Sequence, residues 1–220
     1  VILFMAPGND VRVASEIATW MPGYKELSVG NHLFMTIQWM LSSFANEGKA
    51  FFIAIWAAGF LLLVKSKKAK VYQSLAVVFS VVALLPYAGI SFFSEMGIGY
   101  IDIEQCLTEL PTWQTMTTQN RIAFFWWIAA VLFTLVLLWK VTGHSVFISM
   151  AFLGGIASEA VLHFSPTIYA SGARVYYLTD LMYLFIILWM VMRMDSEKKK
   201  NLFIAGAAAL GIINFLSQYS

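Results

Sequence analysis

Charged residues are scarce in this chain of 220 residues. Asp, Glu, Lys and Arg together make up 12% of it, whereas about a quarter of a typical globular protein is charged. Hydrophobic residues account for 60% and aromatic residues for 16%. Folding cannot bury that much apolar surface, so we expect lipid to be the solvent for much of the chain. This composition excludes a cytosolic enzyme and a disordered tail.

Other features are missing as well. The only cysteine, Cys106, excludes an internal disulfide. A net charge of +2 leaves too little concentrated basic surface for nucleic-acid binding. The sequence has no phosphate-binding P-loop, no nucleophile elbow and no zinc-protease motif. None of these motifs therefore indicates a cofactor.

The chain opens on an apolar run, residues 1–7, with no initiator methionine and no basic stretch before it. A secretory signal would need such a basic stretch and a cleavage site. We interpret the run as the end of a membrane helix that begins upstream. The chain is then the C-terminal part of a longer protein.

Six stretches are apolar enough to predict membrane-spanning helices in an all-α bundle. A spanning helix needs about 20 mostly apolar residues, or fewer when lysines flank it, because hydrocarbon does not tolerate unpaired backbone groups. The stretches are residues 49–64, 72–93, 121–140, 144–163, 175–194 and 201–217. Residues 1–220 would thus form one integral membrane domain, with its spanning helices in residues 49–217.

The distribution of charge predicts the orientation, because short cytoplasmic loops collect Lys and Arg. With six spans, three connections fall on one side, and they carry Lys65, Lys67, Lys68, Lys70, Lys140, Arg193, Lys198, Lys199 and Lys200. On the other side acids outnumber bases. We therefore expect loops 65–70 and 193–200 in the cytoplasm of a cell membrane, and segments 6–48 and 94–120 outside it.

Residues 31–46 in the first outer segment have the pattern of an amphipathic helix. Its apolar positions are Leu33, Phe34, Ile37, Met40, Leu41 and Phe44, and its polar positions are Asn31, Thr36, Gln38, Ser42, Ser43 and Asn46. One interpretation is a helix lying in the membrane interface, with Trp39 at headgroup depth. A helix packed beneath the outer loops is equally compatible, because the stretch has no Lys or Arg.

Two acids, Glu159 and Asp180, fall inside predicted spans, where an ionisable side chain is costly and indicates function by default. His163 lies four residues after Glu159 on the same helix face, so the two side chains could share a proton. Arg174 ends a loop that contains proline and glycine, and its guanidinium suits bidentate binding of a phosphate. These four residues either line a polar cavity near the outer leaflet or form interhelical salt bridges.

A second polar group lies near the start of the chain, where residues 7–9 read Pro-Gly-Asn and predict a turn. The turn would direct Asn9, Asp10 and Arg12 toward the membrane surface. They could bind a sugar or a phosphate, or they could form a solvated helix exit.

The second outer loop offers weaker candidates. Its acids Asp102, Glu104 and Glu109 could supply oxygen ligands to a divalent cation, but they lack the spacing of a calcium loop, which favours a solvated acidic face and no metal site. Cys106 has no neighbouring cation that would activate it. Three aromatic residues could stack on sugars: Tyr100 and Trp113 in this loop and Trp20 in the first outer segment. Interfacial aromatics are, however, common in membrane proteins.

Two motifs carry a resemblance. The Ala-Pro-Gly-Asn-x-x-Arg run at residues 6–12 and the Ser-Pro-x-x-Tyr-Ala-Ser-Gly-x-Arg run at residues 165–174 resemble a family of polytopic bacterial membrane proteins of unassigned function. The layout of that family is similar to that of O-antigen-modifying glucosyltransferases and other GT-C glycosyltransferases. The resemblance covers most of the chain as topology and about seventeen residues as motif.

The resemblance implies an enzyme that moves a sugar from a polyprenyl-phosphate carrier to a cell-envelope glycan on the outer face of the membrane. Arg12 and Arg174 would face the phosphate, with Asn9 and His163 also binding substrate. The catalytic base of such enzymes lies in an earlier loop, upstream of Val1. Within this chain Asp10, Glu159 and Asp180 are the remaining candidates for it.

Two alternatives stay open. A lipid-linked polysaccharide polymerase or ligase would use similar arginines in its outer loops. A transporter or flippase would need acids and helix breaks near the bilayer midplane and similar halves, but Glu159 and Asp180 lie near helix ends and no internal repeat is visible.

Overall fold

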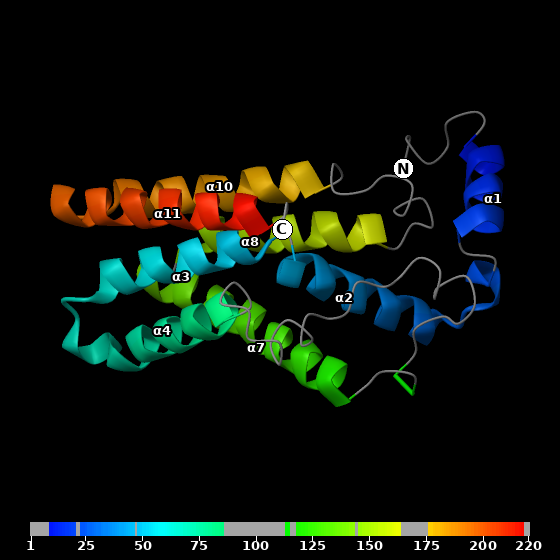
Figure 1. Ribbon diagram of the computed structural model, residues 1–220, viewed down its shortest axis with the longest axis horizontal. Helices are drawn as coiled ribbons and strands as arrows, with labels where there is room; N and C mark the ends of the chain where they lie inside the picture. The colour runs from blue at the N-terminus through cyan, green and yellow to red at the C-terminus, as the bar shows by residue number, and fades with distance from the viewer. Residues whose placement is uncertain are drawn as a thin grey trace.

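A computed structural model describes residues 9–20, 23–46, 48–85, 113–114, 118–143, 145–163 and 176–217. Every regular element in these ranges is a helix (Figure 1). The all-α prediction is therefore confirmed for the described part of the chain.

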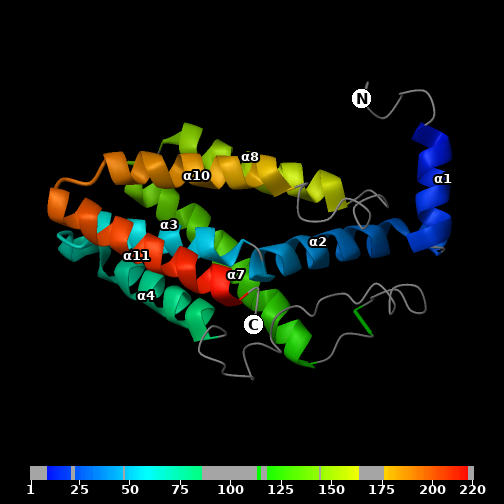
Figure 2. The same ribbon diagram turned by 45° about the horizontal axis from the view of Figure 1, so that its top comes forward.

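Each of the six predicted apolar stretches contains a long helix. These are α3 (Lys49–Leu63), α4 (Lys70–Leu84), α7 (Thr118–Val141), α8 (Val146–His163), α10 (Tyr177–Met192) and α11 (Glu197–Ser217). The members of each pair joined by a short connection run in opposite directions, so the connections after α3, α7 and α10 lie at one end of the bundle (Figures 1 and 2). We call this the basic end, because Lys65, Lys67, Lys70, Lys140 and Lys198 lie there.

These helices differ in whether they are long and apolar enough to cross a bilayer. The segment Arg121–Val141 of α7 is long and apolar enough to cross a bilayer, and the pair α2 (Val29–Asn46) and α3 would provide a second crossing if the bend between them lies within one span. The bend measures 68°. α4, α8 and α10 are apolar but shorter. Within the described residues, length and composition therefore support one spanning helix, or two with the bent pair.

The centre of the bundle is aromatic. Phe52 of α3 is fully buried, and its ring lies 5.1–6.1 Å from those of five neighbours: Phe44, Trp56, Trp127, Phe152 and Tyr183. These rings come from α2, α3, α7, α8 and α10. α3 is thus the central helix, and its neighbours pack around it.

Close approach of α3 to α7 depends on Gly59. A Cβ atom at this position would lie 2.7 Å from Cδ2 of the fully buried Leu137. One turn earlier on α3, the indole N–H of Trp56 donates a 2.8 Å hydrogen bond to Oγ1 of Thr134 on α7. A missing side chain and a polar pair therefore fix the crossing of these two helices.

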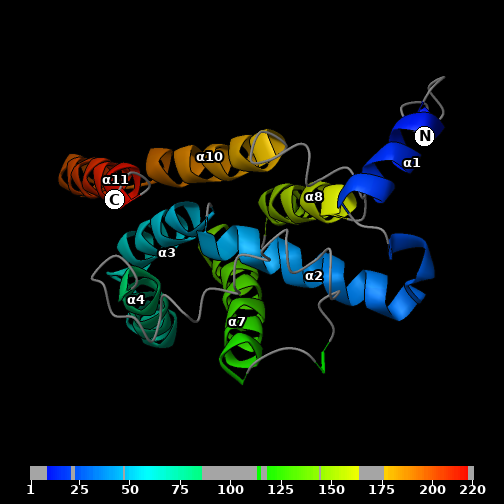
Figure 3. The ribbon, with the colours of Figure 1, turned by 45° about the vertical axis from the view of Figure 1, so that its right-hand side comes forward.

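α2 buries only part of its predicted apolar face, including Leu41 and Phe44. The helix packs against α8, α7 and α3 (Figure 3). Three side chains of the predicted polar face are buried, namely Thr36, Gln38 and Ser43. Two side chains of the predicted apolar face, Leu33 and Ile37, are exposed. The assignment of the two faces was therefore wrong at these positions. Ser43 is buried because it pairs across helices with Glu159, whereas Oγ1 of Thr36 and Oε1 of Gln38 have no hydrogen-bond partner among the described residues. Trp39 is also buried, at 6% exposure.

Ion pairs join two connections at the basic end. The carboxylate of Asp195 lies 2.7 Å from Nζ of Lys65 and 2.9 Å from Nζ of Lys199. Hydrogen bonds from Lys65 and then from Lys199 hold the pKa of Asp195 well below its ordinary value. Asp195 therefore links the end of α3 to the start of α11.

Candidate functional site

The carboxylate of Glu159 is buried inside the bundle. Its side chain, on α8, is 2% exposed. Oγ of Ser43, on α2, donates a hydrogen bond to Oε1 of Glu159 and also lies 2.9 Å from the carbonyl oxygen of Met40. A hydroxyl has one proton, so it can donate to only one of these two oxygens at a time. The polar face of α2 therefore supplies the donor that this acid needs.

Glycine and threonine bring α10 close to α8 at the same level. A Cβ at Gly155 of α8 would lie 3.3 Å from Cε1 of Tyr183, so only a small residue fits there without displacing the ring. Thr179 of α10 is buried, and its hydroxyl donates a 3.2 Å hydrogen bond to the carbonyl oxygen of Gly155. This contact positions the first turn of α10, which carries Asp180.

Glu159 and Asp180 line one small pocket. Its volume is about 10 Å³, which is room for about one water molecule. Its walls come from α2, α8 and α10, with Gly48 just before the first residue of α3. The lining residues are Ser43, Phe44, Gly48, Glu159, Tyr176, Thr179, Asp180 and Tyr183. We call this the acidic pocket.

Tyr183 contributes a buried hydroxyl to the acidic pocket. Its side chain is 1% exposed, and its hydroxyl has no hydrogen-bond partner within the described part of the chain. A buried hydroxyl without a partner is costly. A water molecule or a polar ligand group in the acidic pocket would remove this cost by accepting its proton.

The acidic pocket lies at the end of the bundle opposite the basic end. Asp180 is in the first turn of α10, and Glu159 is four residues before the last residue of α8. Gly48 precedes the first residue of α3. All three helix ends lie away from the connections that carry the lysines (Figure 1).

The structure thus brings two of the predicted site residues together. His163 ends α8, but its side chain is outside the described residues, as is the whole of Arg174. The proposed proton sharing between Glu159 and His163 and the phosphate-binding role of Arg174 therefore stay predictions.

The N-terminal candidates lie on a helix. α1 (Asn9–Trp20) begins at Asn9, so the backbone of Asp10 and Arg12 is helical and lies in the first turn of α1. Their side chains are outside the described residues, and so are residues 1–8. Whether Arg12 and Arg174 face a common cavity therefore stays a prediction.

The second outer loop is largely outside the described residues, including Asp102, Glu104, Cys106 and Glu109. Of its aromatic candidates, Trp113 is described, and it contacts Arg121. The guanidinium carbon of Arg121 lies 5.1 Å from the centre of the Trp113 ring, and Nη2 donates to the Trp113 carbonyl oxygen at 3.0 Å. Trp113 therefore has an intramolecular contact as well as a partly exposed ring. Across the ranges that the structure describes, no group of three or more His, Cys, Asp or Glu side chains could hold a metal ion.

The sequence did not identify Ser43, Thr179 and Tyr183. Ser43 was assigned to the polar face of its helix. Thr179 and Tyr183 lie in a largely apolar run, and the run alone does not show that they line a pocket. The spacing of Thr179, Asp180 and Tyr183 on one side of α10 was the available signal.

Comparison with known proteins gives no relative. No protein-family model matches this sequence, and neither a curated protein nor a solved structure is significantly similar to it.

Proposed function

We propose that the chain is a polytopic membrane domain in which α3, α4, α7, α8, α10 and α11 all cross the bilayer, with the basic end in the cytoplasm. The clustering of lysines at the connections after α3, α7 and α10 supports this orientation, because positive charge is retained on the cytoplasmic side. Exposed apolar side chains on the outer faces of the bundle support contact with lipid. They include Val71, Val78, Phe147, Met150, Leu181, Leu188, Ile204 and Ile212.

The shorter helices can still cross. α4 has 15 residues and α10 has 16, which corresponds to about 22–24 Å at the α-helical rise. A hydrocarbon core of about 30 Å can thin locally, and flanking lysines can extend their side chains to the headgroups. Lys70 at the start of α4 and Arg193 after α10 are placed for this.

The activity we propose is transfer of a sugar from a polyprenyl-phosphate carrier to a cell-envelope glycan on the outer face. The observation that carries it is the acidic pocket, with Glu159 buried and Asp180 beside it at the end of the bundle opposite the basic end. Glycosyl transfer needs a carboxylate that removes the proton of the acceptor hydroxyl. The two motifs support arginine contacts to the phosphate, through Arg12 and Arg174.

Four variants of the full-length protein test this activity in cells at normal expression: Glu159→Gln, Asp180→Asn, Arg12→Ala and Arg174→Ala. Glu197→Gln is the matched control, because Glu197 is an exposed acid at the basic end. We expect loss of a carboxylate base to lower glycan modification by about 10²–10⁴-fold, and the arginine variants to weaken donor binding. Wild-type modification in all four variants, with the control unchanged, would contradict the proposal.

A transporter or flippase is the second candidate, and one observation favours it. The 68° bend between α2 and α3 lies beside Gly48 and the acidic pocket. Broken helices whose ends meet a polar group are common at transport sites. Purified full-length protein in proteoliposomes distinguishes the two functions, because a flippase moves the lipid-linked sugar without cleaving it.

A further inference from the structure

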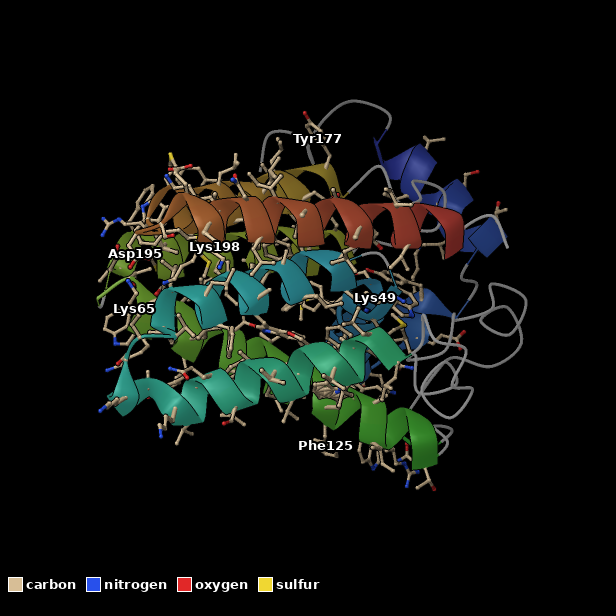
Figure 4. All side chains as sticks on the ribbon, turned by 60° about the vertical axis from the view of Figure 1, so that its left-hand side comes forward. Lys49, Lys65, Phe125, Tyr177, Asp195 and Lys198 are labelled. Carbon is tan, nitrogen blue, oxygen red and sulfur yellow. The ribbon has the colours of Figure 1, made fainter. Side chains whose placement is uncertain are left out.

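A second feature of the bundle, away from the acidic pocket, is an apolar groove between α4 and α11. The groove has a volume of about 480 Å³, which is the size of a ligand site. α4 and α11 both pack on α3 and lie on either side of it (Figure 4). The lining of the groove comes from α3, α4 and α11 and is apolar apart from the hydroxyl of Ser80.

Small residues on α11 keep this groove open. A Cβ added at Gly206 would meet nothing within 4 Å, so no atom of the described residues fills the space beside it. Larger side chains on both walls remain exposed, including Leu202 at 62% and Val81 at 51%. The described residues therefore leave apolar side chains of the groove exposed.

Each wall of the groove continues into a lysine at the basic end. On α11 the positions Leu202, Gly206, Ala209 and Ile213 share one face, and Lys198 lies one turn before Leu202 on that face. On α4 the positions Val77 and Leu84 follow Lys70 at intervals of seven residues. Lys70 and Lys198 are both exposed, and neither forms an ion pair among the described residues.

The length of the groove matches one leaflet. From Leu202 to Ile213 the α11 wall rises about 16 Å, and half of a hydrocarbon core is about 15 Å. An apolar groove of this length, with two unpaired ammonium groups at one end, has the shape and charge of a single phospholipid with its chain along the helices.

We propose that the groove binds one anionic phospholipid of the cytoplasmic leaflet, with an acyl chain between α4 and α11 and its phosphate at Lys70 and Lys198. This inference rests on the proposed membrane orientation. The lipid stabilises the bundle by covering α3 where α4 and α11 leave it open, and the two lysines select a negative headgroup.

The test is a lipid titration of the purified full-length protein in a neutral detergent, followed by native mass spectrometry. Phosphatidylglycerol and phosphatidylcholine with identical acyl chains are the probes. Each lysine near a membrane surface contributes about five-fold to anionic lipid binding, so we expect one phosphatidylglycerol to bind about 25-fold more tightly than phosphatidylcholine. Lys70→Gln and Lys198→Gln should each remove about five-fold of that preference. Lys140→Gln, an equal change of charge at the same end on α7, should leave it unchanged.

The groove itself is tested by Gly206→Leu, which places a side chain in the space without a backbone clash. Gly154→Leu on α8 is the matched control, because a Cβ there also meets nothing within 4 Å and the position is outside the groove. We expect Gly206→Leu to weaken both lipids at least ten-fold and Gly154→Leu to weaken neither.

Equal binding of the two lipids, or equal binding by the two leucine variants, would overturn the proposal. A Gly206→Leu protein that changes its oligomeric mass while keeping its lipid would also overturn it, since a second copy would then cover the groove. The titration contains no sugar donor, so its failure is separate from failure of the glycan assay. Failure of the protein to remain in carbonate-washed membranes would remove the membrane orientation and both proposals with it.

Discussion

At the scale of single residues, three hydrogen bonds of polar side chains inside this bundle join neighbouring helices. Trp56 donates to Thr134, Ser43 donates to Glu159, and Thr179 donates to a backbone carbonyl of the neighbouring helix. Apolar packing lacks direction, since hydrocarbon side chains pack nearly as well against lipid as against one another. These few directional contacts therefore specify which helix faces lie inside.

The Trp56–Thr134 pair provides a test of this view. Thr134→Val keeps the shape of the side chain and removes the acceptor for the fully buried Trp56 indole. We expect the free energy of unfolding to fall by about 1 kcal/mol, the lower part of the range for an unpaired buried donor and close to values for membrane helices. Denaturant unfolding of the purified protein in detergent measures the change.

A double-mutant cycle separates the hydrogen bond from the packing. Trp56→Phe should cost less stability in the Thr134→Val background than in the wild type, because the indole N–H has already lost its partner there. Strictly additive effects would show that the hydrogen bond contributes nothing.

The acidic pocket illustrates how far the sequence could predict a site at this scale. Glu159 and Asp180 were identified because a charge in an apolar run is visible by itself. Tyr183 and Ser43 were not, since their part in the pocket depends on which residues α8 and α2 bring beside them. A hydroxyl in an isolated helix has no property that predicts its partner.

At the scale of helices, the apolar runs predicted where the helices lie but not how α2 faces the bundle. Apolar side chains can also lie on the outside of a bundle, as Leu33 and Ile37 do on α2. Periodicity then identifies two faces without identifying the inner one. The hydrogen bond from Ser43 of α2 to Glu159 of α8 shows that this side of α2 lies inside. The contact exists only in the tertiary structure.

The crossing of α3 and α7 leads to a prediction about Gly59. Gly59→Ala places a Cβ within 2.7 Å of Leu137 Cδ2 and 3.0 Å of its Cγ. Since Leu137 is fully buried, we expect a loss of about 1–3 kcal/mol from overpacking. Gly154→Ala is the control, where open space surrounds the new Cβ and the helix propensity of alanine stabilises by up to about 1 kcal/mol.

A second substitution decides whether the contact is the cause. Leu137→Val removes the δ carbons, so Gly59→Ala should destabilise the Leu137→Val protein much less than the wild type, as measured by denaturant unfolding. Equal destabilisation in both backgrounds would point to the helix backbone instead.

The ion pairs of Asp195 couple α3 to α11 and make this link dependent on pH. Because the pKa of Asp195 is depressed in the folded protein, its contribution to stability is present above the ordinary carboxyl pKa of about 4 and is lost as the pH falls further toward the folded value. Asp195→Asn should therefore lower the thermal midpoint at pH 7. The difference from wild type should shrink below about pH 4.

The effect should be small, because Asp195 is exposed to solvent, and high salt should reduce it. Glu197→Gln is the comparison, since Glu197 pairs with Lys200 within one helix and joins no second element. A difference for Asp195→Asn that persists unchanged in acid would show that the carboxylate charge is not responsible.

At the scale of the whole molecule, most of the lysines lie at one end of the bundle. Lysines gather where α3, α7 and α10 end, and the acidic pocket lies beside the starts of α3 and α10. The helix ends that carry these two features are at opposite ends of the bundle (Figure 1). In a cell membrane, these lysines would orient the bundle with the basic end in the cytoplasm. The acidic pocket would then lie toward the outer leaflet, and the lipid phosphate at the apolar groove between α4 and α11 would lie at the inner leaflet. A reaction at the outer face and a lipid bound at the inner face would therefore not compete.

Cysteine labelling tests this arrangement directly. Single cysteines replace Lys67, Thr118, Lys140 and Tyr177 in a full-length protein in which Cys106 and any other cysteine are serine, and intact cells receive a membrane-impermeant maleimide. Six spans place Thr118 and Tyr177 outside, so both should react. Lys67 and Lys140 would react only after the cells are permeabilised.

Two of these positions distinguish six spans from one. If α7 alone crossed the bilayer, Lys67 would lie on the same side as Thr118, and Tyr177 on the same side as Lys140, because no crossing would separate the members of each pair. Lys67 would then react in intact cells and Tyr177 would not. That reversal would contradict the six-span bundle even though α7 itself keeps its orientation, since Thr118 and Lys140 behave identically in both cases.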